Sequence, residues 1–200
     1  MGGKELRIAI VVGTRGRGSN MAAIVDAWKG GNIPADEVTV VAPSAESPAA
    51  QLAREKGVSV RVLDPQTELL RFVEDERIDL ICLAGYMKKL PADVVSALRC
   101  RIINIHPALL PKHGGQGMYG MRVHESVLSS GDRESGCTVH FVTEEYDEGD
   151  PLLQLRCEVR GDDTPETLAA RVLELEHQAY PEAIRIWIQR YGQPGRNASL

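Results

Sequence analysis

An asparagine and a histidine separated by one residue close a short apolar stretch of the chain. Asn104 and His106 end the run that begins at Arg101, and Pro107, which has no backbone N–H to donate, follows directly. Residues two apart on an extended strand project to the same side, so an amide and an imidazole are expected to point together. Such a pair can bind and protonate a developing oxyanion. The same spacing is also typical of a strand end with a turn-forming asparagine and a structural histidine.

A glycine-rich turn after the first apolar run is a second candidate site. The turn spans residues 13–20 and ends in Gly18, Ser19 and Asn20, directly before a helix-like segment. Backbone N–H groups at such a helix start favour a phosphate. No Gly-Lys-Ser/Thr follows, and Met21 occupies the third glycine position of the dinucleotide pattern. The turn therefore predicts mononucleotide phosphate binding, or else a simple chain reversal.

Two carboxylates lie where a ligand or a catalytic base can use them. Asp147 lies in an acidic turn before Gly149, which is the ordinary place of a turn former. If the fold brings Asp147 to His106, it would raise the imidazole pKa and hold the ring protonated near neutrality. Glu176 lies on the apolar stripe of the last helix and needs a partner, either a ligand hydroxyl or amine or a basic residue such as Arg171.

Composition limits the class of function. The chain has 200 residues and a net charge of −5, which argues against nucleic acid as its main partner. Its four cysteines form no Cys-x-x-Cys pair and its histidines show no metal-binding spacing, so we expect no metal and a structural or surface role for His113, His124 and His140. No signal peptide and no apolar run of transmembrane length are visible, so we expect a cytoplasmic protein that does not enter a membrane.

The order of elements predicts an α/β fold. Strand-like runs at 6–12, 38–42, 58–62, 78–83 and 102–105 alternate with helix-like segments at 20–29, 48–56, 68–76 and 91–98. This rhythm indicates a Rossmann-like, mostly parallel sheet flanked by helices. A loop at 112–120, a short helix and strands at 137–142 and 152–159 then form a mixed-sheet portion. A long helix from Thr164 closes the chain, and Pro181 is expected to kink or divide it. One domain is expected over residues 1–200, with 193–200 frayed.

Five segments, in this order, make the chain resemble the folate-dependent phosphoribosylglycinamide formyltransferase family. They are the turn Gly18-Ser19-Asn20, the stretches 83–87 and 104–111, the strand 138–143 with Asp147, and Glu176-His177. The resemblance implies transfer of the formyl group of 10-formyltetrahydrofolate to the amine of 5-phosphoribosyl-glycinamide, in de novo purine biosynthesis, through an oxyanion-stabilised tetrahedral intermediate. It implies small-molecule substrates and fits a monomer or a homodimer.

The same resemblance implies the residue roles. Asn104 would hydrogen-bond the oxyanion, His106 as imidazolium would stabilise and protonate it, and Asp147 would keep His106 charged and relay protons through water. The substrate phosphate would lie on Gly18, Ser19 and Asn20, with Glu176 reaching the sugar or the glycinamide end. The folate would lie along two segments, Met87, Lys88, Lys89 and Leu90, and Thr143, Glu144, Glu145, Tyr146 and Asp147. We read Lys88 and Lys89 either as contacts for the folate glutamate tail or as a solvated pair.

Two other functions are compatible with the same motifs. Another formyltetrahydrofolate-using enzyme, such as a deformylase or an enzyme with a different acceptor, shares the formyl-handling core, but we expect such enzymes to carry a further domain. A non-catalytic nucleotide-binding protein would use the glycine-rich turn without turnover. That alternative does not require Asn104, His106 and Asp147 to converge, so the distances among these three residues distinguish it.

Overall fold

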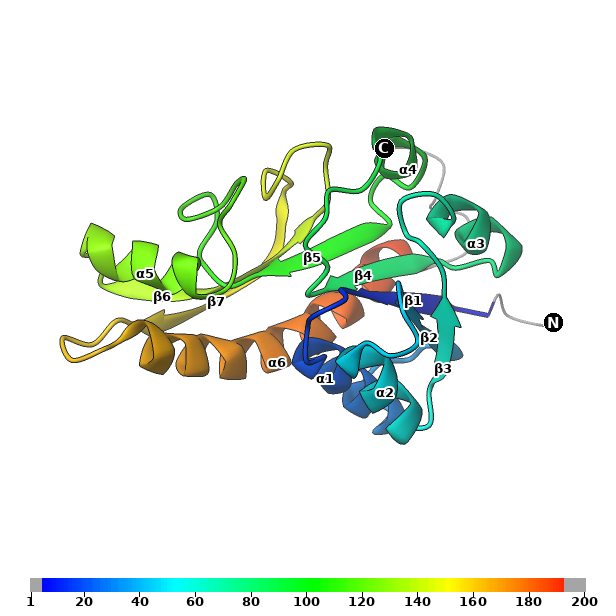
Figure 1. Ribbon diagram of the computed structural model, residues 1–200, viewed down its shortest axis with the longest axis horizontal. Helices are drawn as coiled ribbons and strands as arrows, with labels where there is room; N and C mark the ends of the chain where they lie inside the picture. The colour runs from blue at the N-terminus through cyan, green and yellow to red at the C-terminus, as the bar shows by residue number, and fades with distance from the viewer. Residues whose placement is uncertain (1–4, 193–200) are drawn as a thin grey trace.

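The computed structural model of this chain describes residues 5–192, which build one seven-stranded sheet between layers of helices (Figure 1). The strands are β1 (Arg7–Val12), β2 (Glu37–Ala42), β3 (Ser59–Val62), β4 (Leu80–Ala84), β5 (Ile102–His106), β6 (Glu134–Phe141) and β7 (Pro151–Glu158). The helices are α1 (Ser19–Lys29), α2 (Pro48–Glu55), α3 (Leu69–Asp75), α4 (Ala92–Ala97), α5 (Met121–Ser130) and α6 (Pro165–Tyr191). The tail at 193–200, for which fraying is expected, lies outside the described residues.

The sheet has the order β3-β2-β1-β4-β5-β6-β7. Strands β1 to β5 run parallel, whereas β6 pairs antiparallel with both β5 and β7. Strand β4 is apolar and buried along its whole length, as expected for a parallel strand covered on both faces. The expected Rossmann-like sheet with a mixed C-terminal portion and a long closing helix is confirmed.

Helices cover both faces of the sheet (Figure 1). Apolar side chains of α1, α2, α5 and α6 join one core, which includes Met21, Val127 and Trp187. Side chains of α3 and α4, such as Phe72 and Val94, join the core on the other face. Helix α6 packs against α1, α5, β6 and β7 and so spans the parallel and the mixed portions of the sheet. This path brings Glu176 of α6 toward the start of α1.

The start of α6 agrees with its sequence signals, but its interior does not. Thr164 caps the helix in a reciprocal capping box with Thr167, and Pro165 occupies the first turn. The expectation that Pro181 could divide the helix is wrong, because α6 continues through it to Tyr191. The residues that follow Pro181, including Trp187, are buried against the sheet. This burial outweighs the one helical hydrogen bond that proline cannot make.

The carboxyl ends of β1, β4 and β5 meet at one edge of the sheet. Strands β1 and β4 are neighbours, and the strand order reverses between them, which is where open α/β sheets bind ligands. A Cβ atom at Gly13 would lie 2.4 Å from the carbonyl oxygen of Gly85, so only glycine lets the turns after β1 and β4 approach this closely. The Tyr180 hydroxyl of α6 donates to the carbonyl oxygens of Leu83 (2.7 Å) and Ile103 (3.2 Å) just below this edge.

Candidate active site

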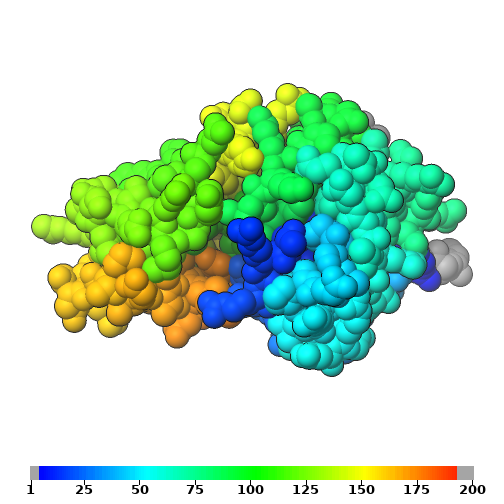
Figure 2. Space-filling view, in the orientation of Figure 1, coloured from blue at the N-terminus to red at the C-terminus, as the bar shows by residue number. Residues whose placement is uncertain are grey.

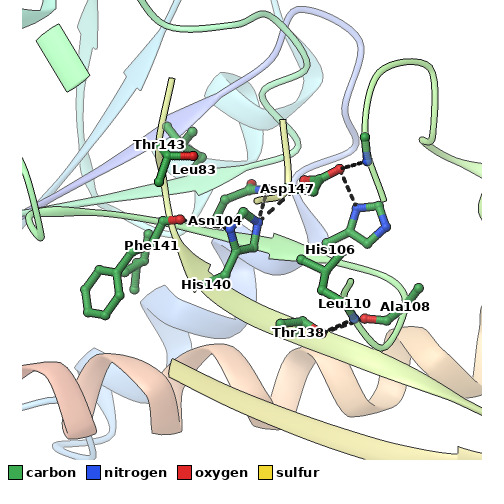
Figure 3. Close-up of polar contacts among 12 residues, drawn as sticks. Leu83, Asn104, His106, Ala108, Leu110, Thr138, His140, Phe141, Thr143 and Asp147 are labelled. Atoms are coloured by element: carbon green, nitrogen blue, oxygen red, sulfur yellow. Dashed lines mark hydrogen bonds and ion pairs between the residues drawn. The ribbon is translucent and has the colours of Figure 1, made fainter. Parts of the chain in front are cut away.

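Asn104, His106 and Asp147 converge at this edge (Figure 3). Asn104 and His106 come from the end of β5, and Asp147 comes from the loop after β6. His106 Nδ1 lies 3.4 Å from Asp147 Oδ2, and the His106 side chain is only 5% exposed. The backbone N–H of Gly115 donates to the same Asp147 oxygen at 3.0 Å. His106 and Asp147 therefore belong to one cluster, and Asn104 projects from the same strand end.

His140 connects the two halves of this cluster. Strand pairing places His140 of β6 opposite Asn104 of β5. Its Nδ1–H donates to the carbonyl oxygen of Phe141 at 3.0 Å, because a carbonyl only accepts. Its Nε2 lies 3.2 Å from Asn104 Nδ2 and 3.5 Å from Asp147 Oδ1. The imidazole thus accepts from the Asn104 amide when neutral and can donate to Asp147 when protonated.

The protonation of His106 differs from the expectation. Burial lowers the pKa of His106 below its ordinary value, and the neighbouring Asp147 carboxylate and the His113 carbonyl raise it by less. The prediction that Asp147 holds the ring protonated near neutrality is therefore wrong for the free protein, since desolvation of the imidazolium outweighs the ion pair. For Asp147 itself, burial raises the pKa, but the hydrogen bond from His140, the nearby His106 ring and the Gly115 N–H together outweigh it and lower the pKa.

A cavity of about 590 Å³ opens in front of the cluster. In the space-filling view it is the hollow between the loops after β5 and β6 and the turn after β1 (Figure 2). Its walls include these predicted site residues: Ser19, Asn20, Met87, Asn104, His106, Tyr146, Asp147 and Glu176. Gly18 lines neither this cavity nor the smaller one beside it, and neither does Glu144, which is exposed.

The glycine-rich turn and the last helix meet at one end of the cavity. Gly18 precedes α1 with φ at 80°, a left-handed conformation that favours glycine, and no side chain caps the helix. Asn20 Nδ2 donates to Glu176 Oε2 at 2.6 Å. Glu176 therefore does not pair with Arg171, which instead binds Asp163 through two contacts of 2.8 Å. Burial raises the pKa of Glu176, and the Asn20 amide lowers it by less.

The predicted folate segments meet at the other end. A pocket of about 50 Å³ adjoins the cavity and is lined by Leu83, Tyr86, Lys88, Lys89, Leu90, Asn104, His140, Val142, Thr143, Glu145, Tyr146 and Asp147. Lys89 Nζ lies 3.2 Å from Glu145 Oε2 and 5.9 Å from the centre of the Tyr146 ring. The two predicted segments therefore touch each other across this pocket. Of the two lysines, the structure gives Lys89 a partner on the opposite segment.

Some residues for which the sequence predicted only a structural or surface role lie next to the cluster or line the cavity. His140 is part of the cluster, and its signal, the register between β5 and β6, is visible only after the strands pair. His124 of α5 is 5% exposed, lines the cavity, and has a buried Nδ1 without a partner among the described residues. The backbone of 113–115 contacts both His106 and Asp147. Within residues 5–192, no group of three or more His, Cys, Asp or Glu side chains is arranged to hold a metal ion, and no helix is long and apolar enough to cross a membrane.

Comparison with known proteins agrees with this geometry. The family model described as formyl transferase matches residues 6–184. The chloroplastic phosphoribosylglycinamide formyltransferase of Arabidopsis thaliana is 42% identical over 189 residues, which cover 89% of this chain and 64% of that protein. The phosphoribosylglycinamide formyltransferase of Escherichia coli (strain K12) is 35% identical over 184 residues, covering 88% of this chain and 84% of that one.

A solved structure has the same overall fold. The crystal structure of glycinamide ribonucleotide transformylase 1 from Symbiobacterium toebii matches with a TM-score of 0.83 at 36% identity, covering 96% of this chain and 92% of that one. The chain spans less than two thirds of the length of the plant relatives it matches, 64% and 60%. The chain belongs to the formyl transferase family.

Proposed function

We propose that this protein transfers the formyl group of 10-formyltetrahydrofolate to the amine of 5-phosphoribosyl-glycinamide. The observation that carries the proposal is the convergence of Asn104, His106 and Asp147 on one cavity whose far end holds Asn20 and Glu176. The relatives named for this reaction support the choice of acceptor. When bound, 10-formyltetrahydrofolate supplies a formyl carbon that an amine can attack.

Asn104 supplies the neutral donor for the charge that develops on the formyl oxygen. Its amide N–H groups lie at the end of β5 and face the cavity, and in the free protein Nδ2 is held by His140 at 3.2 Å. A preorganised donor in a water-poor site stabilises a developing oxyanion without having to reorganise. The hydrogen bond to His140 therefore keeps the amide oriented until negative charge appears within its reach.

His106 transfers the proton that the reaction moves. The attacking amine carries a proton that must leave as its lone pair forms the new C–N bond, and the folate nitrogen must gain one as the old C–N bond breaks. With its pKa lowered by burial, His106 is predominantly neutral at pH 7 and can accept the amine proton at Nδ1. Asp147, 3.4 Å away, stabilises the resulting imidazolium, which then returns the proton. The cluster thus transfers one proton from the amine to the folate nitrogen and stabilises the negative charge on the formyl oxygen.

The acceptor substrate is placed by the turn after β1 and by α6. The first backbone N–H groups of α1 lack helical partners and favour a phosphate. Glu176 is 8% exposed, so its carboxylate has few water contacts and gains from a ligand hydroxyl or amine. The Asn20 Oδ1 atom is buried and has no partner among the described residues. It therefore offers the ligand a further hydrogen-bond acceptor. These groups suit a phosphorylated sugar that carries an amine.

The opposite end of the cavity suits the folate. Met87 is apolar but 53% exposed, and it lies on the cavity wall beside Tyr86 and Tyr146. An exposed apolar surface next to a polar cluster is typical of a pocket for a flat, partly aromatic ligand. Residues 88–90 and 143–146 would hold the pterin, and Lys89 would lie at the rim. Glu144, which lines neither cavity, is the predicted folate residue with the least structural support.

The proposal is tested by product identification. The purified full chain is incubated with 10-formyltetrahydrofolate and 5-phosphoribosyl-glycinamide, and products are separated and identified by mass spectrometry. We expect formylated ribonucleotide and tetrahydrofolate in equal amounts, each dependent on both substrates. Release of formate without formylated product would show a hydrolase instead. Binding of the ribonucleotide without any turnover would support a non-catalytic nucleotide-binding protein.

A further inference from the structure

His124 is a buried polar residue on a helix face that is otherwise apolar. It lies near the start of α5, whose other buried residues are Val123 and Val127. The residue is 5% exposed, and its Nδ1 is buried without a hydrogen-bond partner among the described residues. A buried imidazole nitrogen without a partner costs free energy, so an apolar side chain of similar size would stabilise this helix better. The fold alone therefore gives no reason for a histidine at this position.

The unpaired nitrogen of His124 belongs to the wall of the cavity that holds the catalytic cluster. Among the described residues, four side-chain atoms are buried and have no hydrogen-bond partner. Two of them, His124 Nδ1 and Asn20 Oδ1, belong to residues that line this cavity, and the other two, on Ser135 and His177, do not. Each unpaired buried polar group calls for an explanation, and a ligand that enters the cavity supplies one for this pair.

The position of His124 assigns it to the part of the cavity proposed for the ribonucleotide. Helix α5 packs against α6, and Ala169, Leu173 and Glu176 of α6 line the same cavity. Among the described residues that line the adjoining pocket, which is proposed for the pterin, none comes from α5 or α6. His124 therefore lies with Glu176, on the side of the acceptor substrate.

The charges of the cavity wall indicate what His124 can offer a ligand. The wall carries two carboxylates, Asp147 and Glu176, and its described residues include no lysine or arginine. The oxygens of a phosphorylated, amide-bearing sugar must therefore find neutral donors on this wall, and a neutral imidazole has one N–H to give. No hydrogen bond to the protein holds Nδ1, so the ring can turn about its Cβ–Cγ bond to meet such an oxygen.

We propose that His124 is an acceptor-binding residue that donates an N–H to an oxygen of 5-phosphoribosyl-glycinamide. With Asn20 and Glu176 it would form a three-sided site for this substrate, built from α1, α5 and α6. The inference rests on the proposed function, because it concerns the same acceptor. It adds a binding residue for which the sequence predicted only a structural or surface role.

Binding is measured by isothermal titration calorimetry of the full chain with one substrate at a time, so that no formyl transfer occurs. In His124→Leu, which removes both ring nitrogens at similar volume, we expect Kd for 5-phosphoribosyl-glycinamide to rise about tenfold, because one ligand oxygen loses its donor. Kd for 10-formyltetrahydrofolate should change less than about twofold. His124→Gln, which keeps an N–H donor, should restore part of the affinity. Glu125→Gln, which changes an exposed residue of the same helix, should bind both substrates like the native protein.

Urea unfolding without ligand distinguishes a binding role from a structural one. Because Nδ1 has no partner in the free protein, His124→Leu should unfold at a urea midpoint equal to or above that of the native protein. A histidine that serves the fold would give the opposite pattern, a lower midpoint with an unchanged affinity. In steady-state formyl transfer, KM for the ribonucleotide should rise about tenfold in His124→Leu while kcat stays within about threefold, as expected for lost substrate binding.

Three results would overturn the proposal. A Kd for 5-phosphoribosyl-glycinamide within about twofold of native in folded His124→Leu would remove His124 from the acceptor site and leave the proposed formyl transfer standing. Weakened binding of 10-formyltetrahydrofolate alone would place His124 on the wrong substrate. Failure of the native chain to bind 5-phosphoribosyl-glycinamide would refute the proposed function together with this inference. If His124→Leu does not fold, His124→Met, whose flexible side chain fits irregular space, decides in its place.

Discussion

Removing the Asn104 amide should slow formyl transfer with little effect on substrate binding. The loss of one oxyanion donor typically costs about 3 to 4 kcal/mol of barrier. Asn104 Nδ2 carries two N–H groups, and only one of them can donate to His140 Nε2 at 3.2 Å, so the second remains available for the oxyanion in the transition state. The loss in Asn104→Ala is then about 3 to 4 kcal/mol, or a decrease in kcat of roughly 150- to 900-fold.

The assay is steady-state formyl transfer at saturating 10-formyltetrahydrofolate, with kcat and KM measured separately. We expect KM for both substrates to stay within about threefold, because the amide acts on charge that is absent from the ground state. Asn32→Ala removes an equivalent amide from the loop after α1 and should keep the native rate. A kcat within about threefold of native for Asn104→Ala, or a loss confined to KM, would refute the oxyanion assignment.

Three further changes test other parts of the site and the fold. Burial lowers the pKa of His106, and the proposed catalysis needs the neutral form of its ring. The value of kcat/KM should therefore be flat near pH 7 and fall as the pH drops below 6.5. A rise of kcat/KM on acidification would instead favour an imidazolium in the free protein. Glu176→Gln keeps an acceptor for Asn20 but removes the charge, so KM for the ribonucleotide should rise about tenfold with kcat little changed; an unchanged KM would remove Glu176 from the binding site. Tyr180→Phe deletes a buried donor to two carbonyls, so urea unfolding should show a loss of roughly 1 to 2 kcal/mol; a change near zero would mean that these carbonyls do not need it.

The fold, Asn104 and His106 follow from local sequence patterns. Alternating apolar runs and amphipathic segments specify a parallel sheet with helices on both faces, and the spacing of Asn104 and His106 specifies a common direction at the end of β5. Asp147 could be named from the sequence only as a conditional candidate, since its distance to His106 depends on how β6 pairs with β5. The partner of Glu176 likewise required the structure, because Asn20 lies 156 residues away in the sequence.

The protonation of His106 could not be predicted because two opposing effects decide it. The sequence shows that a carboxylate is available, which would raise the pKa, but it does not show how deeply the ring is buried, which lowers it. The position of His140 could not be predicted for a similar reason. Spacing along the chain excludes a metal-binding motif, but it does not show that strand register places His140 between Asn104 and Asp147.

The central claim, that Asn104 and His106 act on the same reacting carbon, is tested most directly by a double-mutant cycle in single-turnover formyl transfer. The rates of Asn104→Ala, His106→Ala and the double variant are compared with the native rate. Groups that act as a unit in one transition state give losses that are far from multiplicative. We predict that the double variant is little slower than His106→Ala alone. Losses that multiply would show that the two side chains act independently and would contradict the proposed site.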